Sequence, residues 1–510
     1  MKYDIILIGT GAGGGTMAAK LAPTGKNILV LERGGFVPRE KENWDTEEVF
    51  VKERYKAKEP WVDAKGKEFH PGIHYCVGGN TKFYGAALLR MREEDFEEVH
   101  HHAGVSPKWP ISYKDLKPYY QEAETMYHVH GERGTDPTEP KEENPYPEKA
   151  LPHEPRIQKL FDDIKELGLQ PFPLPIGVKN TDAEGVAPFV LDRFDGFPDP
   201  TESKGDSHVM GIKKALEYPN VTLKTNAEVT KLITNDSGDK ITKVAVSING
   251  EHTFLESEIV IVACGAINSA ALLLKSKNEK HPNGLANGSD VVGRYYMCHN
   301  NSAMVALSKT PNHTKFGKTF AINDFYFKGD NGFDFPMGHI QMLGKSDPAM
   351  FKGDAPKFTP GFTLEIMATY ALDFWMTSED LPLPENQVVV LENGNIQLKY
   401  TENNLEGHNR LLDKLKWILE NVGCETHIIP NNIYLGKKIP LAGTAHQCGT
   451  IRFGNNPATS ALDTNCKAHE VDNLYVVDGS FFPSSSAVNP ALTIMAQALR
   501  VSDHLIENVL

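Results

Sequence analysis

DIILIGTGAGGGTMAAKLA, at residues 4–22, decides the fold of this chain, because it joins a short apolar strand to a helix through a glycine-rich loop. Gly9, Gly11 and Gly14 have the spacing G-x-G-x-x-G, and Gly13 is a further glycine of the same loop. This spacing is typical of a dinucleotide site when a strand precedes it and a helix follows. The first glycine permits the tight turn, the second lets the backbone approach a pyrophosphate, and the third lets the helix pack on the strand. The stretch therefore predicts an α/β domain that binds a dinucleotide.

A second strand follows at once and ends on an acidic residue. NILVLE, at residues 27–32, is apolar up to Glu32, which can accept hydrogen bonds from both hydroxyls of an adenosine ribose. The N–H groups at the start of the intervening helix can receive the phosphates. An acidic residue at the ribose disfavours the 2′-phosphate of NADP, so FAD and NAD remain as candidates. The order of strand, loop, helix and strand predicts a Rossmann-like domain.

Length and composition exclude several other classes of protein. A chain of 510 residues suggests two large units rather than one core. The net charge of −14 argues against a nucleic-acid partner, and no apolar run is long enough for a membrane span. The apolar run at the N-terminus reads as a strand and not as a secretory signal. Six cysteines without paired spacing indicate reduced thiols in a cytoplasmic protein.

Further along the chain, three stretches carry a specific resemblance: CVGGNTKFYGAALLRMR at 76–92, VACGAINSAALLLKS at 262–276, and the blocks HQCGTIRFG and VDNLYVVDGSFFPSSSAVNPALTIMAQALRVSDHL within 446–505. Together with the glycine loop they resemble the sequence blocks of the glucose-methanol-choline oxidoreductases, which are FAD enzymes that oxidise alcohols. The blocks occur in the order of that family from residue 5 to residue 505. The resemblance therefore implies FAD rather than NAD.

The same resemblance implies where the FAD is held. A glycine-rich loop at 78–85 would let a flat ring approach the backbone, because bulky side chains there would block it. Relatives that bind the flavin covalently have a histidine where this chain has Phe83, so the FAD is expected to be non-covalent. Val229 is expected near the adenine, and Asp478 near the ribityl chain. The full expected set, beyond the residues of the first loop and Glu32, is Gly79, Asn80, Tyr84, Val229, Gly265, Asp478, Gly479, Pro490 and Thr493.

The helix PALTIMAQALRVSDHL, at residues 490–505, is apolar on nearly every side, which predicts that it lies inside the flavin domain. Pro490 suits the first helical position, where its missing N–H group costs nothing. The resemblance implies that the positive end of this helix faces flavin N1 and the C2 carbonyl. Such an end is worth about 0.3–1 kcal/mol when exposed and up to about 2 when partly buried.

Two residues are the expected catalytic pair. His446, followed by Gly449 and Thr450, matches the active-site histidine of the family, and Asn489 matches a position that is His in some relatives and Asn in others. A histidine with a pKa near neutral can take the hydroxyl proton as hydride leaves for the flavin, while an asparagine can orient the same oxygen. Other histidine clusters, at 100–102 and 128–130, have no ligand set at known spacing, so no metal is expected.

The expected fold class is α/β, or α+β over the whole chain. The FAD-binding domain is expected to be discontinuous, at roughly 1–100, 200–302 and 440–510. Residues 303–439 contain five segments that read as strands and predict a substrate-binding domain with a mostly antiparallel sheet. These segments include FTLEIMATYA and a hairpin, QVVVLENGNIQLKY, with its turn at Asn393-Gly394. Residues 101–199 read as an irregular segment that covers the cleft.

Within the family, NTKFYGAALLR, VSPKWPISYKDLKPYY and SEDLPLPENQVVV look most like bacterial members related to pyranose oxidases and glycoside 3-oxidases. The expected reaction is therefore oxidation of a secondary ring hydroxyl of a sugar or glycoside to a keto-sugar, with electrons passing to oxygen or to another acceptor. One alternative is a dehydrogenase of a sugar acid or polyol with a quinone or cytochrome partner, and another is a flavin-binding protein without turnover. Homo-oligomerisation is left open. Candidates for stacking on a pyranose are Phe325, Tyr326, Phe374 and Trp375, each of which reads equally well as strand core.

Overall fold

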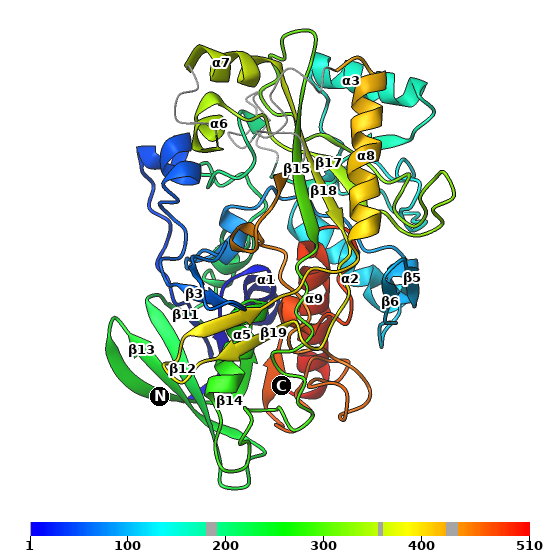
Figure 1. Ribbon diagram of the computed structural model, residues 1–510. Helices are drawn as coiled ribbons and strands as arrows, with labels where there is room; N and C mark the ends of the chain where they lie inside the picture. Colours follow the sequence, from blue (N-terminus) through cyan, green and yellow to red (C-terminus); the bar gives the residue numbers. More distant parts are fainter. Residues whose placement is uncertain (1, 180–190, 355–360, 425–436) are drawn as a thin grey trace.

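The main sheet is assembled from strands that lie far apart in the sequence. The computed structural model describes residues 2–179, 191–354, 361–424 and 437–510. Its main sheet has the strand order β11-β2-β1-β14-β13-β12, and β22 pairs with β14 as well. Strands β12, β13 and β14 of this sheet lie in the lower part of Figure 1. The strands are β1 (Lys2–Ile8), β2 (Ile28–Leu31), β11 (Val221–Lys224), β12 (Ala227–Thr234), β13 (Ile241–Ile248), β14 (Glu251–Val262) and β22 (Leu474–Val476).

Strand β14 belongs to two differently built halves of this sheet. Its second half pairs in parallel with β1 and β22, while its first half pairs antiparallel with β13. The parallel strands β1 and β2 are nearly continuous apolar runs, because helices and loops cover both faces of the sheet there. The predicted Rossmann-like arrangement of strand, glycine loop, helix and strand is confirmed.

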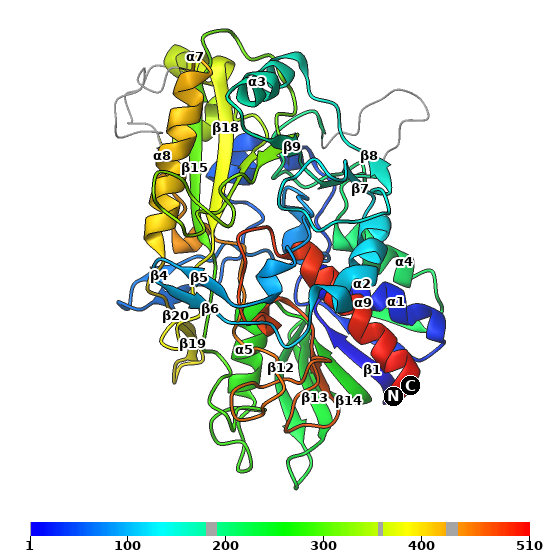
Figure 2. The ribbon, with the colours of Figure 1, turned by 90° about the vertical axis from the view of Figure 1, so that its right-hand side faces the viewer.

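Three helices pack together beside the main sheet. Helix α9 (Ala491–Asn508) contacts both α1 (Ala12–Leu21) and α2 (Tyr113–Met126), and the three lie together in Figure 2. The first half of α9 is buried on all sides, which explains its apolar sequence. The helix begins one residue later than expected, with Pro490 as its cap residue, and the carbonyl of Pro490 accepts the N–H of Ile494 at 3.1 Å.

The second large sheet is antiparallel throughout and has the strand order β21-β15-β18-β17-β16-β9. Helix α8 (Leu405–Asn421) packs against β15 and β18 in the upper part of Figure 1. The predicted antiparallel sheet is therefore confirmed. Its strands are β9 (Pro171–Pro173), β15 (Asn300–Leu307), β16 (Phe320–Ile322), β17 (His339–Met342), β18 (Ala371–Ser378) and β21 (Lys437–Lys438).

Two of the expected strand segments differ in the structure. FTLEIMATYA forms helix α7 (Gly361–Tyr370), because Leu364, Met367 and Ala368 have helical spacing and bury one face. The hairpin turn at Asn393-Gly394 forms as predicted. Its strands, however, join a separate four-stranded sheet with the order β19-β20-β3-β4. These strands are β3 (Trp61–Asp63), β4 (Glu68–Phe69), β19 (Gln387–Val390) and β20 (Ile396–Lys399).

The segment 101–199 is more regular than its sequence suggested. It contains α2 and the strongly amphipathic α3 (Pro155–Glu166), and it contributes β9 to the antiparallel sheet. Residues 180–190, 355–360 and 425–436, which belong to two of the expected segments, lie outside the described residues, and the domain boundaries remain predictions. Besides several short 3-10 and π turns, the remaining α-helices and strands of the described residues are α4 (Lys213–Ala215), α5 (Ala266–Lys275), α6 (Pro348–Asp354), β5 (Val99–His101), β6 (Gly104–Ser106), β7 (Val129–Gly131), β8 (Glu148–Lys149) and β10 (Ile176–Gly177). Across the part of the chain that the structure describes, no helix is long and apolar enough to cross a membrane.

Candidate active site

A cavity of about 660 Å³ extends from the carboxyl ends of β1 and β2 to the antiparallel sheet. Its walls come from the glycine loop, the end of β2, the loop before residue 88, the start of α5 and the start of α9. The far wall is formed by residues of β17 and β18 and by the segment that carries His446. Most of the expected cofactor residues line it: Gly9, Gly11, Gly13, Glu32, Gly79, Asn80, Tyr84, Val229, Gly265, Asp478, Gly479 and Pro490.

The glycine loop combines close packing with one open position. A Cβ atom on Gly9 would collide with the carbonyl of Ala263, and Gly9 also has a φ of 102°, which side chains rarely adopt. A Cβ atom on Gly14 would collide with the carbonyl of Gly9 inside the loop. On Gly11, in contrast, a Cβ atom would meet nothing within 4 Å and would enter the cavity. The loop therefore leaves space for a group that approaches the backbone closely.

Glu32 is buried at the end of β2 with its carboxylate at the cavity. One of its oxygens, Oε2, accepts the N–H and the hydroxyl of Thr10 at 3.2 and 2.5 Å, and Oε1 accepts the N–H of Gly34 at 3.0 Å. Burial raises the pKa of Glu32, although these hydrogen bonds oppose the shift. A carboxylate fixed in this way is well placed to accept ribose hydroxyls.

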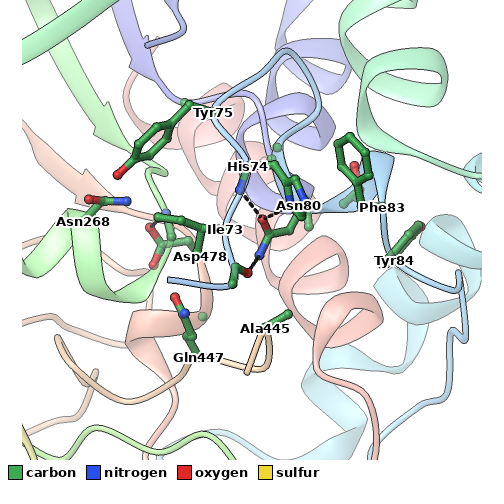
Figure 3. Close-up of a pocket in the computed structure, with 18 of the residues that line it drawn as sticks. Ile73, His74, Tyr75, Asn80, Phe83, Tyr84, Asn268, Ala445, Gln447 and Asp478 are labelled. Atoms are coloured by element: carbon green, nitrogen blue, oxygen red, sulfur yellow. Dashed lines mark hydrogen bonds between the residues drawn. The ribbon is translucent and has the colours of Figure 1, made fainter. Parts of the chain in front are cut away.

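Asn80 holds the loop that forms the middle of the cavity wall. Its Oδ1 accepts the N–H of His74 at 2.9 Å and lies 3.3 Å from His74 Nδ1 (Figure 3). The ring of Phe83 stacks on the ring of His74 with centroids 3.9 Å apart. Burial lowers the pKa of His74 to about 4, so this imidazole is neutral at physiological pH. Tyr84 donates its hydroxyl to the carbonyl of Gly205.

Asp478 joins the end of β22 to the start of α5. Its carboxylate accepts the N–H of Gly265 at 3.0 Å, the N–H of Ser480 at 2.9 Å and the hydroxyl of Ser269. Gly265, which caps α5, has a φ of 85°, and a Cβ atom there would meet nothing within 4 Å. Asp478 and Gly265 thus present a second open, polar corner beside the glycine loop.

Two expected cofactor residues do not line the cavity. Thr493 is fully buried, and its hydroxyl hydrogen-bonds the hydroxyl of Tyr120 at 2.8 Å. This contact arises because Thr493 lies on the side of α9 that packs against α2. The side chain of Thr493 therefore does not reach the cavity, and a contact between Thr493 and the cofactor remains a prediction. Gly14 supports the packing of α1 on β1, as its position in the motif predicted.

His446 and Asn489 lie together at the cavity wall. Asn489 Nδ2 is 3.4 Å from His446 Nε2, although the two residues are 43 positions apart in the sequence. Burial lowers the pKa of His446 well below 6.5, and the neighbouring His299, Lys318 and His339 lower it further. The near-neutral pKa expected from the sequence therefore does not hold in this setting, and His446 is an unprotonated base at physiological pH.

The antiparallel sheet contributes Trp375, one of the stacking candidates, and Gln341, which the sequence did not single out. Gln341 on β17 and Trp375 on β18 are cross-strand partners and both line the cavity. The Trp375 ring centroid lies 6.4 Å from that of His446. Lys318 and Asp195 form an almost fully buried ion pair on the same wall. No short motif marks these residues, because the register of the sheet brings Gln341 and Trp375 together and the tertiary fold brings Lys318 to Asp195.

Other candidate residues have structural roles. Of the pyranose-stacking candidates, only Trp375 lines the cavity, whereas Phe325, Tyr326 and Phe374 are buried in the core. Within the described ranges, no group of three or more metal-ligating side chains is found. All six cysteines, each of which the structure describes, are free thiols.

Comparison with known proteins identifies the family. Two models described as GMC oxidoreductase match the chain, one over residues 8–300 and the other over residues 411–498. The first alone spans more than half of the chain, so this protein belongs to the GMC oxidoreductase family. It is an FAD-dependent oxidoreductase that acts on CH–OH groups.

Individual relatives match over nearly the whole chain. One is 6'''-hydroxyparomomycin C oxidase of Streptomyces lividus, 29% identical over 98% of this chain and 90% of that protein. Another is the fructose dehydrogenase large subunit of Gluconobacter japonicus, 24% identical over 100% of this chain and 98% of that protein. The solved structure of pyridoxine 4-oxidase from Mesorbium loti has a TM-score of 0.70 at 16% identity and 99% coverage of both chains, which shows the shared fold.

The residues of the cavity fit FAD. Gly11 and Gly265 leave the space that a nucleotide next to the backbone requires, and the first N–H groups of α1 have no partners within the helix. Glu32 offers acceptors for a ribose, and Phe83 adds an apolar ring to the wall. When bound, FAD supplies a ring that accepts hydride from an alcohol carbon.

Proposed function

We propose that this protein oxidises a secondary ring hydroxyl of a sugar or glycoside to a keto group, and that His446 takes the hydroxyl proton. The observation that carries this proposal is the contact between Asn489 Nδ2 and His446 Nε2, 3.4 Å apart at the cavity wall. Two nitrogen atoms at this separation can both reach one hydroxyl oxygen. Asn489 would donate a hydrogen bond to that oxygen, and His446 would accept its proton.

The side chains beside this pair support a sugar as the substrate. Trp375 and Gln341 lie side by side on the sheet and offer an aromatic ring and a carboxamide to the cavity. An aromatic ring next to hydrogen-bonding groups suits a pyranose, which has apolar C–H faces and polar hydroxyl edges. A sugar can therefore contact Trp375 and Gln341 while its reacting hydroxyl lies at His446.

The buried ion pair favours a neutral sugar over a sugar acid. Burial alone would raise the pKa of Asp195, but Lys318 and the N–H of Gly344 lower it below its usual value, so its carboxylate is ionised. The charge of Lys318 is thereby balanced within the wall. A substrate carboxylate would therefore gain no unbalanced positive charge from Lys318, which argues against the alternative of a sugar-acid dehydrogenase.

We propose that the reduced flavin passes its electrons to oxygen or to another acceptor. One of the two relatives is named an oxidase and the other a dehydrogenase, and fructose dehydrogenase is named for a sugar. We propose that FAD is held without a covalent bond, because Phe83 occupies the position of the histidine that forms one in other relatives. The proposed FAD contacts are the twelve expected cofactor residues that line the cavity, and the free cysteines support a reducing, cytoplasmic location.

Anaerobic reduction of the bound flavin tests this function. Free sugars, glycosides, polyols, sugar acids, short primary alcohols and choline would each be mixed with the purified protein, and loss of the yellow colour followed over time. Sugars or glycosides should reduce the flavin much faster than choline or short primary alcohols. If choline were the best reductant, the assignment to sugars would be wrong. A protein that no substrate reduced would support the alternative of a flavin-binding protein without turnover.

Readmission of air after reduction identifies the acceptor. Rapid return of the yellow colour with formation of hydrogen peroxide would indicate an oxidase. A reduced flavin that persists in air but is reoxidised by a soluble quinone would indicate a dehydrogenase.

A further inference from the structure

His299 lies directly behind His446, on the side away from the cavity. Its Nδ1 is 3.1 Å from His446 Nδ1, and the two rings are nearly perpendicular, with centroids 5.1 Å apart. His299 is 2% exposed, so water does not compete for this contact. The two nitrogen atoms form a hydrogen bond only if one of them carries a hydrogen and the other does not.

The contact of His299 with Ser485 decides which nitrogen is the donor. His299 Nε2 is 3.2 Å from the carbonyl oxygen of Ser485, and a carbonyl oxygen can only accept. Nε2 of His299 must therefore carry the hydrogen, which leaves Nδ1 of a neutral ring as an acceptor. His446 Nδ1 must then donate to it, so His446 Nε2 has no hydrogen and presents its lone pair beside Asn489.

The charges around the pair are consistent with two neutral rings. Burial lowers the pKa of His299, and although the carboxylate of Asp380 opposes this shift, the pKa stays below 6.5. Glu379 also faces His299, while Lys318 and His339 face His446. The pKa of His446 is likewise lowered, first by burial and then by these cationic or ionisable neighbours.

We propose that His299 is a positioning residue that holds His446 in the Nδ1–H tautomer, so that Nε2 is the base for the substrate hydroxyl. The proposal rests on the proposed function, because it specifies how the base of that reaction is prepared. In the other tautomer, His446 would present an N–H group to the cavity and could not accept a proton there.

The backbone of His299 is held in a conformation that a histidine seldom adopts. Its φ is 63°, in the left-handed region. Asp380 accepts the N–H groups of Cys298 and His299 at 3.0 and 2.9 Å, and Asn301 donates to the carbonyl of His299 at 3.1 Å. Strained backbone of this kind persists only where its surroundings fix it, and it is concentrated at functional sites. Here it directs the ring of His299 at both Ser485 and His446.

Three substitutions separate this role from a general contribution to folding. In His299→Leu the acceptor is lost, and anaerobic reduction of the flavin should slow at least about 10-fold, since misplaced tautomers and lost orienting partners cost about 10-fold to 10⁴-fold in other enzymes. In His299→Asn the amide oxygen can accept from His446 Nδ1, and asparagine tolerates a positive φ. The Asn variant should therefore recover most of the rate that the Leu variant loses.

His299→Asp gives a result that a purely structural role would not. Its carboxylate can accept from His446 Nδ1 but also stabilises a protonated His446, so the pKa of His446 should rise. The rate falls as pH is lowered through that pKa, so the acid limb of the reduction profile should move to higher pH by about 1 unit or more. An unmoved acid limb in this variant would contradict the proposal.

Nitrogen-15 NMR of histidine-labelled holoenzyme reads the tautomer directly. The signals of His446 are those that disappear in His446→Gln, and they should show a protonated Nδ1 and a bare Nε2 in the parent. In His299→Leu the Nε2–H form should become populated. A parent spectrum with hydrogen on Nε2 of His446 would overturn the proposal, even if His299→Leu failed to fold. Because the spectrum needs no substrate, it decides the tautomer independently of whether sugars reduce the flavin.

Discussion

His446 and Asn489 present two nitrogen atoms to the same corner of the cavity, but only one of them can accept a proton. The amide of Asn489 is a donor at this position, whereas the imidazole of His446 has a lone pair when neutral. The two side chains are therefore expected to contribute unequally. Removal of the base should cost more than removal of the residue that orients the hydroxyl.

We expect His446→Ala to keep its fold and its FAD but to slow flavin reduction by roughly 10²–10⁴-fold, the usual cost of losing a general base. This range corresponds to about 2.7–5.4 kcal/mol of activation free energy. Asn489→Ala should slow reduction less and leave its pH dependence unchanged, and Asn489→His should retain part of the activity. Stopped-flow reduction with the best sugar between pH 6 and 9 measures all three. A His446→Ala variant that reduces as fast as the parent would exclude this pair as the site.

The sequence identified some of these residues and not others for a physical reason. His446 and Asn489 could be predicted because each lies in a stretch whose order of residues resembles known relatives. His299, in the stretch MCHNN, gives no such signal, because its role depends on a positive φ and on a carbonyl 186 positions away. Sequence patterns describe local spacing, whereas this contact is set by the tertiary fold.

At the scale of secondary-structure elements, local periodicity predicted most of the main sheet but assigned one segment of the antiparallel domain to the wrong type of element. The strands around the glycine loop are apolar runs with clear turn signals on both sides. Residues 362–371 combine β-branched and aromatic residues with apolar positions at helical spacing, and burial of one face decided in favour of α7. The hairpin at Asn393-Gly394 was predicted correctly, yet its partner strand, β3, lies more than 300 residues earlier.

Gly11 and Gly13 provide a matched pair that separates packing of an element from binding of the cofactor. A Cβ atom on Gly13 would collide with the carbonyl of Val477 at the end of β22, while one on Gly11 would enter the open cavity. Gly13→Ala should therefore lower the stability of the apoprotein by about 1–3 kcal/mol, the usual cost of overpacking.

Gly11 has a φ of −68°, which suits alanine. Gly11→Ala should therefore leave the stability of the apoprotein nearly unchanged and weaken FAD binding. Thermal unfolding of both apoproteins, together with titration by FAD, measures the two effects. Equal losses of apoprotein stability in the two variants would show that the cavity beside Gly11 is not open as described.

At the scale of the whole molecule, the cavity joins the main sheet to the antiparallel sheet, so one cofactor would contact residues from nearly the full length of the chain.

The purified protein should be yellow with about one FAD per chain. The FAD should be released by acid denaturation, because Phe83 cannot form a covalent bond to it. Absorbance of the supernatant after precipitation measures the released flavin.

Colour that stayed with the precipitated polypeptide would show a covalent bond through another residue. His74, whose imidazole stacks on Phe83 and lines the cavity, is the first residue to examine by peptide mapping. Recovery of NAD in place of FAD would contradict the assignment of the cofactor.

The pairing of β22 with β14 has a consequence for the time course of synthesis. Residues 260–262 of β14 pair with residues 474–476, so more than 200 residues separate the two strands along the chain. At about 5–20 residues per second, a ribosome needs roughly 10–40 s to add them. During that interval this stretch of β14 has an unpaired edge, and exposed apolar edges of this kind can join strands of other chains. A nascent chain of this protein therefore depends on chaperones, or on transient cover by its own later segments, until β22 has left the ribosome.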